Sequence, residues 1–149
     1  MGRLGRLLSA GAEGQTAAAA TGLLLLRVFA GLGLALGHGM GKLPPKPGFV
    51  RGVTEMGFPV PELFAWASGL AEFGGGLLLA LGLLTRPAAF FVLGNMAVAS
   101  FLRHAGDPFD EREKALLYAA IALCFLLTGP GRYSLDALLW RRKDPLRRR

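Results

Sequence analysis

Four charge-poor apolar runs occupy most of the chain, at about residues 17–41, 63–85, 87–102 and 115–131. A helix needs about 17–25 mostly apolar residues to cross the hydrocarbon core of a bilayer, and the last two runs are on the short side of that range. Hydrophobic residues make up 52% of the 149 residues, whereas an ordinary soluble domain contains about 45–50%. We therefore predict an all-α integral membrane protein, a bundle of four transmembrane helices forming a single domain over residues 1–149.

The connections between the runs and the distribution of basic residues predict the topology. Thr85-Arg86-Pro87 is so short a connection that the second and third spans must form an antiparallel hairpin. With four spans, both termini and this turn share one side of the membrane, which carries ten basic residues against six on the other side. Because basic residues accumulate in cytoplasmic segments, we expect both termini, including the basic tail at residues 132–149, in the cytoplasm. The protein is then a multi-pass component of a bacterial inner membrane.

Two short helices are expected outside the spans. In the segment GFVRGVTEMG, Phe49, Val53 and Met56 recur at helical spacing, which predicts an amphipathic helix lying on the outer membrane surface, although a plain loop is the alternative. After the fourth span, Ser134 can cap a short helix with the sequence LDALLW, which would anchor the chain at the opposite surface.

The charge and cysteine content exclude several classes of function. The net charge of +7 comes from basic residues clustered near the two ends, which suits contact with anionic lipid and not nucleic-acid binding. Cys124 is the only cysteine, so the chain can form neither an intramolecular disulfide nor a CxxC redox pair. Arg27 interrupts the first apolar region, which we interpret as an uncleaved span and not as a signal peptide.

Arg27 and Glu72 are the two formally charged residues deep within the predicted spans. If the first span begins near residue 17 and the second ends near residue 85 on the same side, both residues lie roughly 15–20 Å from that side at 1.5 Å per residue. Opposite charges at matching depth predict a buried ion pair, which either holds the helices in register or takes part in function.

Other polar residues are positioned to form a site near this pair. Arg27 and His38 share one face of the first span, and small residues flank Glu72 on its face of the second. If these faces converge, a pocket opens to the outer surface with Arg27 and Glu72 at its floor, bounded by His38, Lys42, His104, Glu113 and Tyr118. Asn95 and His104 are nine residues apart, about 180° on a regular helix, so both can line this pocket only if the third span is irregular.

Three segments give the chain a family resemblance. HGMGKL after the first span, EFGGGLLLALGLLTRPAA across the second and third, and GPGRYSLD after the fourth together resemble the DoxX family of small four-helix membrane proteins, related to DoxD subunits of thiosulfate:quinone oxidoreductase. The resemblance covers about residues 22–137 and matches His38, Lys42, Glu72, Arg86 and Asp136. It implies a membrane component of an oxidoreductase or redox-stress system.

Three functional hypotheses follow. In the first, the chain is a quinone-interacting subunit: His38 or Tyr118 binds a quinone carbonyl, while Glu72 and Arg27 hold or move the accompanying proton. The sequence has no GxGxxG in a strand-turn-helix context and no set of iron–sulfur cysteines, so electrons must come from a soluble or membrane oxidoreductase partner.

The second hypothesis is a haem ligated by His38 and His104, which lie near the outer face on different helices. Histidines at helix ends are more often interfacial or hydrogen-bonded, which makes this haem site the weaker hypothesis. The third is a non-catalytic scaffold, or a carrier of a small anionic or lipidic molecule. The sequence indicates no metal site, and it leaves turnover and homo-oligomerisation open.

Overall fold

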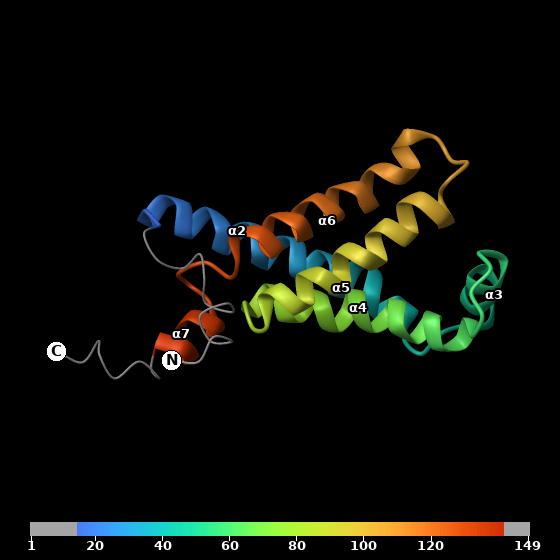
Figure 1. The fold of residues 1–149 in the computed structure, drawn as a ribbon, viewed down its shortest axis with the longest axis horizontal. Helices are drawn as coiled ribbons and strands as arrows, with labels where there is room; N and C mark the ends of the chain where they lie inside the picture. Colours follow the sequence, from blue (N-terminus) through green and yellow to red (C-terminus); the bar gives the residue numbers. More distant parts are fainter. Residues whose placement is uncertain (1–14, 142–149) are drawn as a thin grey trace.

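A computed structural model describes residues 15–141 of the chain, and all regular structure within this range is helical (Figure 1). Six α-helices are joined in places by shorter helical turns. In chain order they are α2 (Ala17–Leu34), the π-turn η1 (Ala35–Gly39), the 3-10 turn η2 (Met40–Lys42), α3 (Pro47–Glu55), α4 (Pro61–Leu81), α5 (Thr85–Val98), the π-turn η3 (Ala99–Arg103), α6 (Phe109–Thr128) and α7 (Leu135–Arg141).

Within residues 15–141, three helical segments are long and apolar enough to cross a membrane: Ala17–Lys42, Pro61–Leu81 and Thr85–Arg103. They confirm the helices expected over the first three apolar runs. The fourth predicted run also forms a helix, but α6 begins at Phe109 and carries charged residues in its first two turns (Asp110, Glu111, Arg112, Glu113 and Lys114). The structure thus confirms a helix in this place without showing that it spans the membrane.

The four long helices run lengthwise beside one another, with α3 at one end and α7 at the other (Figure 1). We call these the α3 end and the α7 end. Helix α4 packs against both α2 and α5, and α5 packs along α6. The hydrophobic core between the helices includes Leu34, Val92 and Phe125, each no more than 1% exposed. The helices formed by the apolar runs of the sequence therefore pack together as a bundle.

Small residues let α2 approach α4 closely. A Cβ atom on Gly31 would lie 2.5 Å from the carbonyl oxygen of Gly76 and 2.7 Å from the nitrogen of Ala80. Toward the α3 end, a Cβ on Gly39 would lie 2.6 Å from the Cα atom of Phe73 and 2.7 Å from the carbonyl carbon of Glu72. These contacts set which residues of α2 and η1 lie level with which residues of α4. They thereby decide which partners the buried side chains of Arg27 and Glu72 can reach.

The hairpin between the second and third spans is present, but the position predicted for its turn is wrong. The chain reverses at Gly82 and Leu84, whose φ angles of 65° and 48° place both in the left-handed region. Thr85-Arg86-Pro87 already forms the start of α5. Proline is tolerated there because the first N–H groups of a helix have no partner within the helix.

Both short helices outside the spans are present. Helix α3 coincides with the predicted amphipathic segment, and its Val53 is 3% exposed. Helix α7 follows Ser134, whose Oγ accepts a hydrogen bond from the Ala137 nitrogen at 3.0 Å. The expected cap is therefore confirmed. The final part of the predicted basic tail, residues 142–149, lies outside the described residues, as do residues 1–14.

Candidate functional site

Glu72 lies on α4 and is 1% exposed, the most deeply buried carboxylate in the span. Its Oε1 atom accepts two hydrogen bonds, one from Lys42 Nζ at 2.6 Å and one from Asn95 Nδ2 at 2.8 Å. Lys42 is therefore the ion-pair partner of Glu72, while Asn95 joins it from α5. The second carboxylate oxygen, Oε2, is buried and has no hydrogen-bond partner among the described residues.

The predicted ion pair between Arg27 and Glu72 is wrong. Arg27 is 3% exposed and donates to three carbonyl oxygens at the α7 end: Nε to Ala80 at 3.2 Å, Nη1 to Pro130 at 2.6 Å and Nη2 to Tyr133 at 2.7 Å. The prediction failed because α2 starts well beyond the level at which α4 ends. Glu72 lies level with Gly39, about twelve residues from Arg27 along α2, or roughly 18 Å.

Arg27 and Asp136 belong instead to a structural junction at the α7 end. The carboxylate of Asp136 accepts hydrogen bonds from the backbone nitrogens of Leu84 and Thr85, both at 2.9 Å, and from Thr85 Oγ1 at 3.0 Å. A carboxylate at a helix N-terminus satisfies free N–H groups and interacts favourably with the helix dipole. Asp136 therefore joins α7 to the start of α5, while Arg27 joins α2 to the segment before α7.

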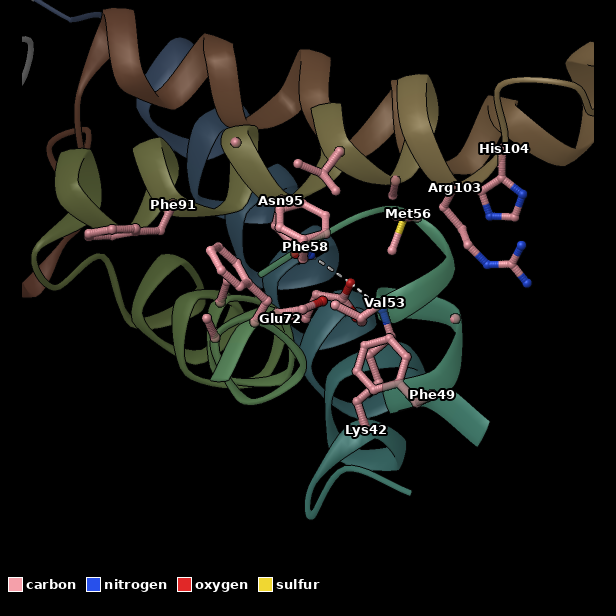
Figure 2. Close-up of a pocket in the computed structure, with 18 of the residues that line it drawn as sticks. Lys42, Phe49, Val53, Met56, Phe58, Glu72, Phe91, Asn95, Arg103 and His104 are labelled. Atoms are coloured by element: carbon pink, nitrogen blue, oxygen red, sulfur yellow. Dashed lines mark hydrogen bonds and ion pairs between the residues drawn. The ribbon is translucent and has the colours of Figure 1, made fainter. Parts of the chain in front are cut away.

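A pocket of about 560 Å³ lies against the Glu72 cluster, between α3, α4 and α5 (Figure 2). Its polar side chains are those of Lys42, Ser68, Glu72, Asn95, Arg103 and His104. Figure 2 shows Phe91 at the opposite end of the pocket from Arg103 and His104. Aromatic side chains form much of the remaining wall, namely Phe49, Phe58, Phe64, Phe90 and Phe91.

The π-turn η3 explains how Asn95 and His104 both line this pocket. The His104 nitrogen donates to the carbonyl oxygen of Ala99 at 3.0 Å, five residues back, which is the bond of a π-turn. The wider turn adds a residue to the helix and changes the angle between the two side chains. The irregular third span, which the sequence required for both residues to share a cavity, is therefore present.

Comparison with known proteins identifies the family. The family model DoxX matches residues 22–105, more than half of the chain. The chain belongs to the DoxX family. The inner membrane protein YqjF of Escherichia coli is 36% identical over 79% of this chain and 92% of its own length. YphA, an inner membrane protein of the same organism, is 30% identical over 76% of this chain and 88% of its own length.

No solved structure matches this DoxX chain significantly. The relatives and the three apolar helices together establish a multi-pass protein of the bacterial inner membrane. All residues lining the pocket fall between Lys42 and His104, within the segment that the DoxX model matches. Helices α6 and α7 lie beyond it. The pocket is thus built entirely from the part of the chain that carries the family match.

Among the residues predicted for the site, Lys42, Glu72 and His104 line the pocket, whereas Arg27, His38, Glu113 and Tyr118 do not. His38 is exposed and its ring lies against Tyr118, with ring centroids 5.7 Å apart. Glu113 is exposed on α6. His104 Nδ1 lies 2.6 Å from a carboxylate oxygen of Asp107. The two histidines proposed as haem ligands therefore have different neighbours, and only His104 lines this pocket.

The aromatic wall is the part of the pocket that sequence reasoning missed. An amphipathic helix on the membrane surface would turn Phe49, Val53 and Met56 toward lipid, but the side chains of these residues, from α3 and its C-cap, line the pocket. Phe90 and Phe91 on α5 look like ordinary span residues in the sequence. A signal was present in the glycines Gly48, Gly52 and Gly94, which line the same pocket without being needed for close packing.

Proposed function

We propose that this DoxX-family protein is the membrane subunit of a quinone-linked oxidoreductase, and that the pocket beside Glu72 binds the quinone or quinol. The observation that carries the proposal is a buried carboxylate, Glu72, which lines an aromatic pocket beside the donors of Lys42 and Asn95 and has one oxygen unpartnered among the described residues. Small-molecule sites are typically apolar cavities with a few convergent polar groups. A quinone, which combines a flat ring, two oxygens and an apolar tail, suits this combination.

The side chains of the pocket suggest how such a ring is held. Lys42 and Asn95 are hydrogen-bond donors and Glu72 is an acceptor, so the two kinds of group that a quinone or quinol oxygen needs lie together. Aromatic side chains offer faces and edges for stacking against the ring. The electrons are expected to come from, or pass to, a partner subunit, because the single cysteine of this chain cannot supply an iron–sulfur site.

The proposal includes four membrane spans with both ends of the chain in the cytoplasm. Helix α6 has 20 residues and packs along α5, which supports it as the fourth span. Ten of the basic residues then lie on the cytoplasmic side against six outside. Reporter fusions at residue 1 and residue 149 are both expected to give cytoplasmic signals, with a fusion in the segment between α5 and α6 periplasmic. Signals on opposite sides for the two ends would contradict four spans.

Filling the pocket tests ligand binding directly. Gly52 and Gly94 line it, and a Cβ on either would meet no atom within 4 Å, so a side chain can start at both positions. Gly52→Leu and Gly94→Leu therefore reduce the free volume of the pocket. We expect each to weaken binding of decylubiquinone to the purified protein at least tenfold, because the ligand and the added side chain occupy the same space. Titration calorimetry in detergent measures the change.

The matched control is Gly74→Leu. Gly74 lies in α4, a Cβ atom there would likewise meet no atom within 4 Å, and the residue does not line the pocket. This variant is expected to bind as the wild type does. Equal affinities for all three variants and the wild type would contradict binding in this pocket. A partner complex that keeps its quinone-linked activity when the pocket is filled would favour the scaffold hypothesis.

A further inference from the structure

The two carboxylate oxygens of Glu72 differ in their hydrogen bonds. Oε1 accepts from both Lys42 and Asn95, so it is well satisfied. Oε2 is buried and accepts no hydrogen bond from the described part of the chain. Because buried acceptors are almost always hydrogen-bonded, an isolated one at a pocket wall indicates that a donor arrives from outside the chain. Glu72 lines the pocket, so a ligand held there is the nearest source of such a donor.

The ion pair between Glu72 and Lys42 restricts what that donor can be. The ammonium group of Lys42 lies 2.6 Å from Oε1, and the carboxylate paired with it is an acceptor only. A ligand atom beside Oε2 must therefore carry a hydrogen. A ligand oxygen that has lone pairs but no hydrogen would face Oε2 acceptor to acceptor, which is unfavourable in a buried site.

We propose that the pocket selects the reduced, hydroxyl-bearing form of its ligand, a hydroquinone, over the oxidised quinone. This inference rests on the function proposed above and adds the redox form to it. A hydroquinone O–H donates to Oε2 of Glu72, and the oxygen of that same hydroxyl can accept from Lys42 Nζ. A quinone offers two carbonyl oxygens and no donor, so it satisfies Lys42 but leaves Oε2 without a partner.

Three ligands that share one ring separate these possibilities: decylubiquinol, decylubiquinone and the dimethyl ether of the quinol, titrated anaerobically against the wild-type protein. We expect the quinol to bind about tenfold or more tightly than either of the others, because a site built around a hydroxyl donor disfavours analogues that lack it. The ether keeps the ring and both oxygens of the quinol but carries a methyl group in place of each hydroxyl hydrogen, so it has no donor for Oε2.

Glu72→Gln is expected to reverse the preference. The amide can keep its oxygen toward Lys42 and Asn95, and its NH₂ group then takes the place of Oε2 and donates to a quinone carbonyl. The control is Glu62→Gln, since Glu62 is an exposed residue in the first turn of α4 and its substitution should leave the wild-type ratio unchanged.

The outcomes distinguish this inference from the function on which it rests. Equal wild-type affinities for quinol, quinone and ether overturn the selection of the reduced form while quinone binding stands. Failure of all three ligands to bind overturns both. The wild-type comparison decides the question by itself, so the inference stays testable even if Glu72→Gln does not fold.

Discussion

Replacing Arg27 with methionine is expected to destabilise the protein by about 3–5 kcal/mol, because three buried hydrogen bonds from one charged donor are lost together. Arg27 is 3% exposed, and loss of its guanidinium group would leave the carbonyl oxygens of Ala80, Pro130 and Tyr133 without this donor. Hydrogen bonds to charged groups contribute about 1.5–3 kcal/mol each, although neighbouring bonds are not additive. Unfolding of the purified variant in detergent, followed by circular dichroism, measures the loss.

The control for this variant is Arg51→Met, an exposed arginine on α3, which should change the stability by no more than about 0.5 kcal/mol. A double-mutant cycle with Glu72→Gln then tests the separation of the two charges. Because Arg27 and Glu72 have different partners, their effects should add to within about 0.5 kcal/mol. A coupling energy well above that value would show that the two residues are in contact.

Gly39→Ala adds a single methyl group and is expected to lower the free energy of unfolding by about 3 kcal/mol or more. This loss is at or above the upper end of the usual range for overpacking. The added Cβ would lie 2.6 Å from the Cα atom of Phe73 and 2.7 Å from the carbonyl carbon of Glu72. These are backbone atoms of α4, so they cannot rotate away as a side chain would. The clash also displaces Glu72, which should weaken ligand binding in the same variant.

Gly37 provides the matched comparison, because it lies in the same π-turn two residues earlier and a Cβ there would meet nothing within 4 Å. Gly37→Ala should leave the stability unchanged or raise it slightly, since alanine favours helix by up to about 1 kcal/mol over glycine. Equal losses for the two alanine variants would mean that η1 and α4 do not approach each other at Gly39. Thermal unfolding of both proteins in one detergent gives the comparison.

The helices could be predicted from the sequence because hydrophobic length and proline position are local properties. Runs of apolar residues marked α2, α4 and α5, and the cap at Ser134 marked α7. The level at which one helix meets another is not a local property. It depends on contacts such as Gly31 with Gly76 and Ala80, which the sequence does not pair. For this reason the sequence suggests equal depths for Arg27 and Glu72, although they lie far apart along the bundle.

The candidate site was predictable in its polar residues but not in its walls. Lys42, Glu72 and His104 could be selected because charged or titratable residues are rare in apolar segments. The amphipathic spacing of Phe49, Val53 and Met56 predicts that these side chains lie in apolar surroundings. Lipid and an aromatic pocket are both apolar, so the spacing does not distinguish between them. The partner of Glu72 was missed because Lys42 lies near the end of its span, where a lysine is normally expected to face water.

The π-turn η3 divides the third span into two parts that can change independently. Asn95, which holds the Glu72 cluster, precedes the turn, whereas Arg103 closes it and His104 directly follows it. A one-residue insertion or deletion at η3 would rotate the residues after the turn about the helix axis and leave the residues before it in place. Sequence changes at η3 can therefore alter the groups at the Arg103–His104 end of the pocket while Asn95 and Glu72 keep their arrangement.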